Sequence, residues 1–238
     1  MGTLLIVATP IGNLKDITIN ALEMLSHAEL VACEDTRRTG QLLSSLEERY
    51  PEFFKRHVNK PRLISYYDQN ELQRIPEILG LLQNGQDVVL VSDAGTPLIS
   101  DPGFKLVREC MQASIRVVTA PGPSSVTAAL TLSGLPTDKF LFLGYPPQKS
   151  GHRKTLYKNI GRSWEVFQTT VVLFEAPHKL LKTLSEIRSA LGDINVVLMR
   201  EVTKIHEERL EGKISEIALR FQKQSPRGEF VLLLPCPF

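Results

Sequence analysis

A short apolar segment that ends in an acidic, glycine-rich turn is the feature that most constrains the fold of this chain. Residues 88–91 (VVLV) are followed directly by residues 93–103 (DAGTPLISDPG). The apolar, mostly β-branched run predicts a buried strand, and the Gly and Pro residues after it predict where that strand stops. In open α/β sheets, ligands bind at the carboxyl ends of strands. The segment therefore predicts a small-molecule site near Asp93.

The rest of the chain repeats this alternation of strand and helix patterns. In the first half, strands are expected at residues 3–8, 29–33, 63–66, 88–91 and 115–119, and helices at residues 17–28, 71–83, 104–111 and 126–132. This order is typical of a parallel sheet with helices on both faces. In the second half, strands are expected at residues 140–144, 170–174, 194–199 and 230–234, and helices at residues 178–191 and 215–221. The sequence predicts two α/β domains, residues 1–120 and 121–238, with the boundary within residues 120–136.

Composition limits the class of protein. A chain of 238 residues that is 42% hydrophobic can bury a sizeable core. Its net charge of +2 argues against coating nucleic acid by bulk charge, although a local basic patch is still possible. Cys33, Cys110 and Cys236 lack the spacing of a zinc site or a disulfide framework. With a strand at the very start and no apolar span, we expect a reduced, soluble, cytoplasmic protein.

Three further strand ends in the first half carry polar groups. TPIGNL (residues 9–14) brings Gly12 near a possible ligand, but a tight turn is the simpler interpretation because the spacing of a phosphate loop is absent. EDTRRTG (residues 34–40) offers carboxylates and guanidinium groups, and an N-cap with surface ion pairs is an equally good interpretation. PGPSS (residues 121–125) suits an anionic ligand group at a helix start, or ordinary capping.

Strand ends in the second half also carry charge. FEAPHKL (residues 174–180) places His178 after Pro177, a position more typical of a surface or capping histidine. REVTKIHEE (residues 200–208) contains His206, but no companion His or Cys falls at metal-binding spacing, so no metal site is predicted. The absence of a Gly-x-Ser-x-Gly motif disfavours a serine hydrolase.

Taken together, the segments resemble a known family in order and across nearly the whole chain. The matching blocks are LLIVATPIGNLKDIT, ACEDTRRTGQLL, VSDAGTPLISDPG, VVTAPGPSSVTAALTLSGLPTDKFLFLGYPP, VVLFEAPHKLLKTL, REVTKIHEERLEGKISEI and GEFVLLL. They are similar to those of the ribosomal RNA small subunit methyltransferase I family, within the tetrapyrrole methylase superfamily.

The resemblance implies an enzyme that uses S-adenosyl-L-methionine to methylate the ribose 2'-hydroxyl of a cytidine in the decoding region of 16S ribosomal RNA, naked or within the assembled small subunit. It also implies a homodimer of two-domain α/β chains, with the cofactor in a cleft between the domains and no membrane partner. The cofactor-binding residues implied in the first segments are Pro10, Gly12, Asn13, Asp93, Ala94, Gly95, Thr96, Ser124, Ser125 and Val126. Those implied in the second domain are Phe174, Glu175, Ala176, Arg200, Glu201 and Gly228.

Methyl transfer to a ribose places demands on the acceptor side of such a site. The methyl group and the attacking oxygen must be held in line. A hydroxyl is a poor nucleophile, so a carboxylate that removes its proton or a cation that stabilises the alkoxide helps. We therefore take Glu34, Asp35 and Arg37 as the catalytic or substrate-orienting set.

RNA binding needs positive charge and aromatic groups that stack on unpaired bases. A basic stretch with aromatic neighbours meets this description: Lys149, His152, Arg153, Lys154, Lys158 and Arg162, with Tyr145, Tyr157 and Trp164. A solvated helix face with a few core aromatics is the competing interpretation.

The chain departs from the family pattern in two places. Residues 65–71 (SYYDQNE) replace a segment that is rich in histidine in relatives, so no histidine role transfers to it. The chain also ends at Phe238, without the helical extension that many relatives carry. Two alternatives stay open: a tetrapyrrole methyltransferase, which would need a large apolar acceptor pocket, and a non-catalytic RNA- or nucleotide-binding module, which would bind the cofactor without turnover.

Overall fold

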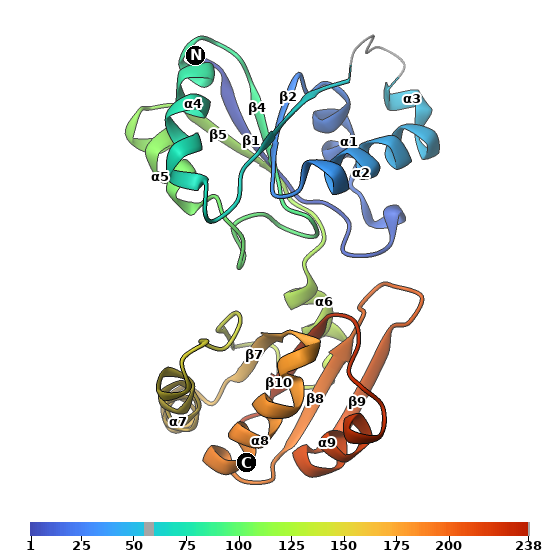
Figure 1. Cartoon of the computed structure of the whole chain (residues 1–238), viewed down its shortest axis with the longest axis vertical. Helices are drawn as coiled ribbons and strands as arrows, with labels where there is room; N and C mark the ends of the chain where they lie inside the picture. Colours follow the sequence, from blue (N-terminus) through green and yellow to red (C-terminus); the bar gives the residue numbers. More distant parts are fainter. Residues whose placement is uncertain (55–59, 238) are drawn as a thin grey trace. The chain divides into compact units, whose positions relative to one another are not determined.

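The computed structural model describes residues 1–54 and 60–237 of the chain, so Phe238, the end of the second predicted domain, lies outside the described residues. The chain divides into two compact units, Met1–Ser124 and Ser125–Phe238 (Figure 1). Each unit contains its own five-stranded sheet.

The first unit is built on a fully parallel sheet. Its strands are β1 (Thr3–Val7), β2 (Leu30–Cys33), β3 (Arg62–Ser65), β4 (Val88–Val91) and β5 (Arg116–Ala120). They are arranged in the order β3-β2-β4-β1-β5, and every neighbouring pair is parallel. The parallel sheet predicted from the alternating pattern is confirmed.

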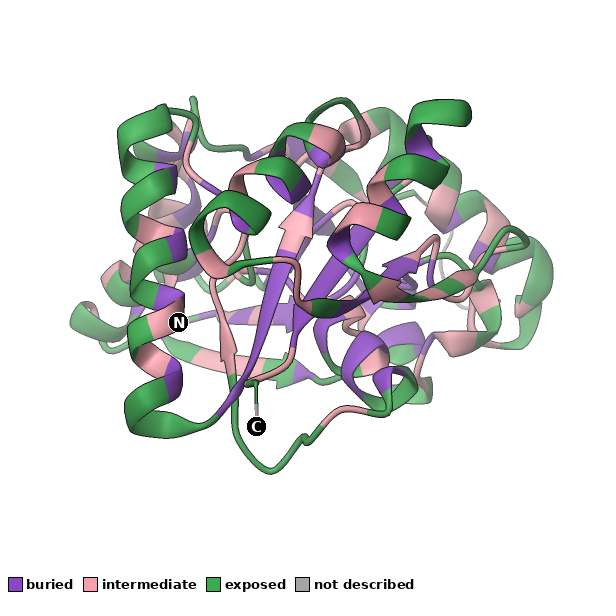
Figure 2. Ribbon diagram, turned by 90° about the horizontal axis from the view of Figure 1, so that it is seen from below, coloured by how far each residue is buried: buried purple, intermediate pink, exposed green. Residues whose placement is uncertain are grey.

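Helices cover both faces of this sheet. Helices α1 (Ile19–Ser26), α2 (Thr36–Arg49) and α3 (Pro51–Phe54) cover one face, and α4 (Glu71–Gln83) and α5 (Phe104–Gln112) cover the other. Successive residues of β4 alternate between the two cores, which is why the run is apolar throughout. Figure 2 shows the central strands as mostly buried and the outer helix faces as exposed.

The second unit has a mixed sheet, which the sequence did not predict. Its strands are β6 (Phe140–Phe142), β7 (Thr170–Glu175), β8 (Asn195–Arg200), β9 (Glu208–Lys213) and β10 (Phe230–Leu234). In the order β6-β7-β10-β8-β9, only β6 and β7 pair in parallel. Strand β9 was missed because it is an edge strand of charged and small residues, ERLEGK.

The helices of the second unit pack on its sheet in two groups. Helices α7 (Ser150–Phe167), α8 (Leu180–Leu191) and α9 (Ile214–Lys223) contribute to one core with β7, β8 and β10. Helix α6 (Ser125–Ser133) contacts β8 and β10. The Arg209 guanidinium on β9 donates from Nε to the Leu132 carbonyl at 2.9 Å and from Nη2 to the Ser133 carbonyl at 2.7 Å. These bonds satisfy carbonyl groups at the end of α6 that lack partners within the helix.

Helices α2 and α7 were not among the helices expected from the sequence. Helix α2 begins at Thr36 within EDTRRTG, and α7 begins at Ser150. Polar and charged residues dominate both helix starts, so the apolar spacing that predicts a helix appears only later in each element. In the described part of the chain, no helix combines the length and the apolar character that crossing a bilayer would require.

Packing of α4 against the sheet provides a stability test for the first unit. Ile78 is 0% exposed in the core, whereas Leu72 on the same helix is 69% exposed. We expect Ile78→Ala to lower the free energy of unfolding by about 2–5 kcal/mol through lost burial and a cavity. Leu72→Ala should change it by less than about 0.5 kcal/mol. Urea unfolding followed by circular dichroism measures both, and equal effects would contradict the packing described.

Candidate functional site

The parallel sheet of the first unit brings several polar turns to one edge. Parallel strands all end on the same side, so the residues after β1, β2, β4 and β5 become neighbours although they are far apart in sequence. Thr9, Glu34, Asp93 and Pro121 lie in those turns. The predicted catalytic set and half of the predicted cofactor-binding set belong to this edge.

Asp93 connects the end of β4 to the start of α2. Its Oδ1 accepts from the Asp35 N–H at 3.2 Å, and its Oδ2 accepts from Arg38 Nη1 at 2.9 Å. The Arg38 side chain is 69% exposed, so water weakens this ion pair. Arg38 directly follows Arg37, the residue predicted for the catalytic or substrate-orienting set.

Gly95 joins the turns after β4, β1 and β5. It exchanges backbone hydrogen bonds with Thr9, N to O at 3.1 Å and O to N at 2.9 Å, and the Thr96 hydroxyl donates to the Pro123 carbonyl at 3.0 Å. The φ of Gly95 is +86°, and a Cβ there would lie 3.1 Å from Ile11 Cγ2. Only glycine fits this junction without strain. The backbone there is held close to the loop that contains Pro10, Gly12 and Asn13.

The remainder of the turn after β4 has an unusual backbone. Leu98 and Ser100 have φ values of 72° and 66°, in the left-handed region. Such conformations cost non-glycine residues on the order of 1 kcal/mol each and persist only where surrounding contacts enforce them. Strained backbone of this kind gathers at ligand-binding loops, which agrees with the prediction made from DAGTPLISDPG.

Carboxylates crowd this edge and change one another's protonation. Burial, followed by the charges of Asp93 and Asp68, raises the pKa of Glu34. Burial and the charge of Glu34 raise the pKa of Asp101 to about 6. Asp68 and Asp101 were not selected from the sequence, because nothing local indicates that they approach Glu34.

Asp35 and Asn13 have clear local roles. The Asp35 carboxylate caps α2, accepting from the N–H groups of Arg37 at 2.8 Å and Arg38 at 3.4 Å, and these bonds lower its pKa. Asn13 Oδ1 accepts from the Lys15 N–H at 3.1 Å and caps the 3-10 turn Leu14–Asp16. The capping interpretation of EDTRRTG is confirmed for Asp35. A catalytic role for Glu34, Asp35 or Arg37 stays a prediction.

The predicted residues around β8 and β10 form an ordered cluster of their own. Glu201 has a φ of +51°, and its Oε1 accepts from Lys204 Nζ at 3.0 Å and from the Glu229 N–H at 2.8 Å. A Cβ on Gly228 would lie 2.6 Å from the Glu201 side chain, so glycine is required there. Arg200 Nε donates to the Arg227 carbonyl at 2.7 Å. These contacts explain the residue types structurally, and their predicted part in cofactor binding stays a prediction.

The two predicted residues at the end of β7, Phe174 and Glu175, have different surroundings. Phe174 packs edge-on against Phe142 and Tyr145, with ring centroids 4.9 and 5.5 Å away. Glu175 is buried and accepts from the Thr183 hydroxyl on α8 and from the Ala176 N–H at 2.8 Å. The Glu175 carboxylate is thereby occupied in the helix layer of the second unit.

Ser124, Ser125 and Val126 fall at the division of the chain. Ser124 ends the first unit, and Ser125 and Val126 begin α6 in the second, where Val126 is buried. Their predicted contact with the cofactor stays a prediction.

The predicted basic stretch separates into exposed and buried residues. Arg153 is buried, with Nε 2.7 Å from Glu186 Oε2 and Nη2 2.8 Å from Glu186 Oε1, and Tyr157 and Trp164 lie in the core. These three residues therefore match the competing interpretation of core side chains. Basic residues are exposed on the outer surface of this segment: Lys149, His152, Lys154, Lys158 and Arg162. Lys154, Lys158 and Arg162 recur every four residues and share one face of α7.

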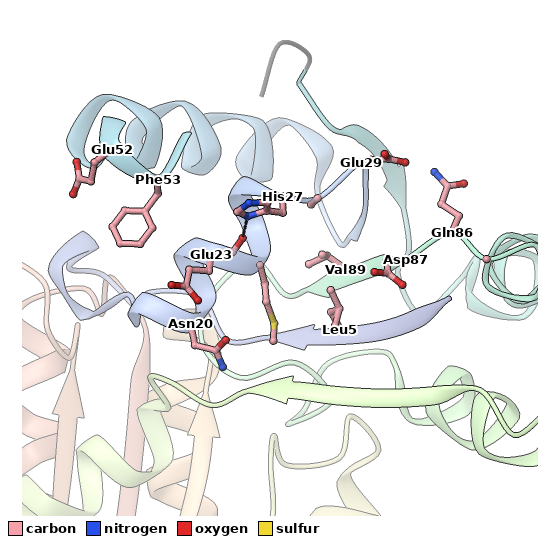
Figure 3. Close-up of a pocket in the computed structure, with 13 residues that line it drawn as sticks. Leu5, Asn20, Glu23, His27, Glu29, Glu52, Phe53, Gln86, Asp87 and Val89 are labelled. Atoms are coloured by element: carbon pink, nitrogen blue, oxygen red, sulfur yellow. Dashed lines mark hydrogen bonds between the residues drawn. The ribbon is translucent and has the colours of Figure 1, made fainter. Parts of the chain in front are cut away.

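A cavity of about 750 Å³ lies elsewhere in the first unit (Figure 3). It is bordered by α1, α3 and the residues that precede β2 and β4, including Glu23, Glu29 and Asp87. The close-up shows the His27 ring hydrogen-bonded to the Glu23 carbonyl, at 2.8 Å. None of the predicted site residues borders this cavity, which is near the amino ends of the strands.

Across residues 1–54 and 60–237, no three His, Cys, Asp or Glu side chains are arranged to hold a metal ion.

Comparisons with known proteins identify the fold family of the chain. Residues 3–218 match the family model of Tetrapyrrole (Corrin/Porphyrin) Methylases. Among solved structures, diphthine synthase is 17% identical with a TM-score of 0.68, over 99% of this chain and 90% of that one. Cobalt precorrin-4 methyltransferase is 18% identical with a TM-score of 0.66, over 97% and 94%. The chain has the α/β tetrapyrrole methylase fold, as predicted.

Curated relatives narrow the assignment. A Thermotoga maritima protein named ribosomal RNA small subunit methyltransferase I is 44% identical over 98% of both chains. An Escherichia coli O157:H7 protein of the same name is 43% identical over 98% of this chain and 77% of its own. The chain belongs to the ribosomal RNA small subunit methyltransferase I family, and the resemblance found in the sequence is confirmed.

The raised pKa of Asp101 predicts a pH-dependent stability. An unperturbed Asp carboxyl has a pKa of about 3.9. In the folded protein, burial and the charge of Glu34 raise the pKa of Asp101 to about 6. Because the folded state binds the Asp101 proton more tightly than the unfolded state, the protonated side chain stabilises the fold. This contribution is complete below the unfolded pKa and is lost as pH rises through about 6. At pH 7.5, Asp101→Asn should raise the free energy of unfolding by roughly 1–2 kcal/mol, less than the full shift because the site is partly solvated.

Thermal unfolding between pH 4 and 7.5 measures this effect. The advantage of Asp101→Asn over wild type should grow with pH. Asp35→Asn should show almost no change with pH across most of this range, because hydrogen bonds from the Arg37 and Arg38 N–H groups lower the pKa of Asp35, and its stabilising effect is lost only as pH falls below the ordinary Asp pKa of about 3.9. A difference between Asp101→Asn and wild type that does not change with pH would contradict the assignment.

Proposed function

We propose that the chain transfers a methyl group from S-adenosyl-L-methionine to the ribose 2'-hydroxyl of a cytidine in 16S ribosomal RNA. The observation that carries the proposal is similarity over nearly the whole chain to relatives named for methylating small-subunit ribosomal RNA. We further propose that the enzyme acts in the cytoplasm as a homodimer on small-subunit ribosomal RNA, naked or within the assembled subunit.

The edge of the first sheet fits the proposed cofactor. S-adenosylmethionine carries a sulfonium and an ammonium group, and the carboxylates of Glu34, Asp68, Asp93 and Asp101 give this edge a negative potential that favours cations. Gly95 leaves no side chain at the junction of three turns, so a ligand can approach the backbone there. When bound, the cofactor supplies an activated methyl group. We assign Asp93, Ala94, Gly95 and Thr96 to holding it, together with the β1 turn at Pro10, Gly12 and Asn13.

The three residues of the proposed catalytic set have different surroundings, which indicate different roles. Burial and neighbouring carboxylates raise the pKa of Glu34, which makes it a stronger base for the ribose hydroxyl proton. Asp35 has a lowered pKa and is held in its capping bonds, so it orients the start of α2. Arg37 follows in the first turn of α2 and supplies a cation for the RNA phosphate or the forming alkoxide.

We assign RNA binding in the second unit to the outer face of α7. Lys154, Lys158 and Arg162 form a stripe of positive charge. After the hydrogen bond from Arg153, the positive charges of Lys182 on α8 and of Lys154 also lower the pKa of Glu186. Because Arg153 already neutralises Glu186, this surface keeps a net positive charge that suits a phosphate backbone. Arg153 itself is excluded from the contact by its burial.

A tetrapyrrole acceptor is the second candidate function, and it is disfavoured. The solved methyltransferases that act on uroporphyrin III or cobalt precorrin-4 are 17% and 18% identical to this chain and show the shared fold alone. The relatives above 40% identity are named for ribosomal RNA.

The direct test is transfer of a labelled methyl group. Labelled S-adenosylmethionine is incubated with the protein and, in separate reactions, small ribosomal subunits, naked 16S RNA and a uroporphyrin precursor, and the label is mapped. We expect label on one cytidine 2'-oxygen of the RNA. Label on the tetrapyrrole alone would overturn the proposal.

Substitution of Glu34 tests its role as the proton acceptor. Glu34→Gln keeps the shape but removes the basic oxygen, so we expect kcat to fall by about 10²–10⁴-fold, the usual contribution of general-base catalysis. The dissociation constant of S-adenosylmethionine should change much less. Single-turnover methyl transfer and calorimetric binding measure the two quantities, and unchanged turnover would refute the role of Glu34.

Substitution of the α7 stripe tests the RNA surface. The triple variant Lys154→Gln, Lys158→Gln, Arg162→Gln should weaken RNA binding and reduce the slope of log affinity against log salt by about 2–3. Cofactor affinity should not change. A control that removes the same charge elsewhere, Arg49→Gln with Lys213→Gln and Lys223→Gln, should leave the RNA affinity at the wild-type value apart from a small general charge effect. Equal losses in both triple variants would argue against a specific RNA surface on α7.

A further inference from the structure

Glu71 is a buried carboxylate at the first residue of α4, and it joins three separate parts of the first unit. The residue is 4% exposed. Its Oε1 accepts from the Tyr66 hydroxyl at 2.8 Å and from the Gly103 N–H at 3.1 Å, and its Oε2 pairs with Lys105 Nζ at 2.8 Å. Both oxygens therefore have donors, as a buried carboxylate requires.

The surroundings of Glu71 favour its charged form. Burial alone would raise its pKa, but the bonds from Lys105, Tyr66 and Gly103 outweigh burial and lower the pKa. The position at the amino end of a helix also favours negative charge. Glu71 is thus a fixed anion that orders its donors.

One of those donors ends the loop proposed to hold the cofactor. Gly103 closes the turn that begins at Asp93 and includes Asp101. At its other end, Gly95 holds the turn through its backbone bonds with Thr9. Between these anchors lie Leu98 and Ser100, whose left-handed conformations need enforcement from outside the turn.

We propose that Glu71 is a positioning residue that holds residues 93–103 in the conformation that binds S-adenosylmethionine. The inference rests on the proposed function, because it assigns Glu71 to the same cofactor loop. Glu71 acts through Gly103 and Lys105. It fixes the far end of a strained turn whose near end holds Asp93.

The carboxylate has no isosteric substitute at this position. In Glu71→Gln, an oxygen still accepts from Tyr66 and Gly103, but the amide NH₂ then faces the Lys105 ammonium, and two donors cannot satisfy each other. Lys105→Met removes that conflict. The double variant Glu71→Gln, Lys105→Met should therefore recover part of what Glu71→Gln loses, which a general loss of packing would not reproduce.

The chain offers a matched control on the same helix. Glu77 lies on the surface of α4, where it pairs with Arg74 at 2.6 Å and with Arg62 at 3.4 Å. Glu77→Gln removes the same charge from the same helix without touching residues 93–103.

Calorimetric titration with S-adenosylmethionine, at a temperature where circular dichroism shows each variant folded, tests the inference. We expect Glu71→Gln to weaken binding about tenfold, the effect of losing one charge-assisted contact. Glu77→Gln should stay within about twofold of wild type, and the double variant with Lys105→Met should fall between. Wild-type affinity in folded Glu71→Gln would overturn the inference.

Two further outcomes are decisive. If Glu71→Gln does not fold, Tyr66→Phe, which removes one donor and keeps the charge, should weaken binding about threefold, and no weakening would overturn the inference. If the wild-type protein does not bind S-adenosylmethionine, the proposed cofactor fails, and the role of Glu71 fails with it. The two failures are distinguishable because the first leaves wild-type binding intact.

Discussion

The parallel pairing of the five strands in the first unit is the constraint on which the candidate site depends. Because each strand returns through a helix, all carboxyl ends fall on one edge, and the turns after β1, β2, β4 and β5 must share the space there. Burial on both faces makes the central strands β2 and β4 apolar along their length, which leaves the turns as the place where polar side chains gather. The bonds of Asp93 and Gly95 to neighbouring turns follow from this crowding.

Crowding also divides the carboxylates of this edge into two kinds. Asp35 and Glu71 have hydrogen-bond donors that lower their pKa values, and both organise the backbone. Glu34 and Asp101 have raised pKa values, because burial and like charges oppose their ionisation. The first kind builds the edge. The second kind is available for proton transfer or for a cationic ligand.

The sequence was sufficient where a structural property is local. The β-branched run of β4 and the Asp35 cap of α2 each depend on neighbours within a few residues, and the family blocks supplied the fold. Properties set by distant partners were not predictable. Arg153 is buried because Glu186 lies opposite it, and the raised pKa of Asp101 depends on Glu34, from another turn of the sheet. The proposed role of Glu71 likewise depends on its contacts with Gly103 and Lys105, which are over thirty residues away in the sequence. The unpredicted β9 illustrates the same limit, since an edge strand needs no apolar run.

A cationic ligand would relieve the repulsion that the free fold maintains. The charge of Glu34 acts on Asp101, and those of Asp93 and Asp68 act on both, so a positive group nearby stabilises their ionised forms together. Part of the free energy that crowding costs the folded chain is then offset on binding, because the cation attracts each carboxylate and compensates their mutual repulsion. Arg38 provides one positive group for Asp93 from the surface, where water weakens the pair. The partner of Asp93 is therefore exchangeable, whereas Tyr66 and Gly103, the buried donors to Glu71, are not. This contrast separates the part of the edge that binds from the part that holds it in place.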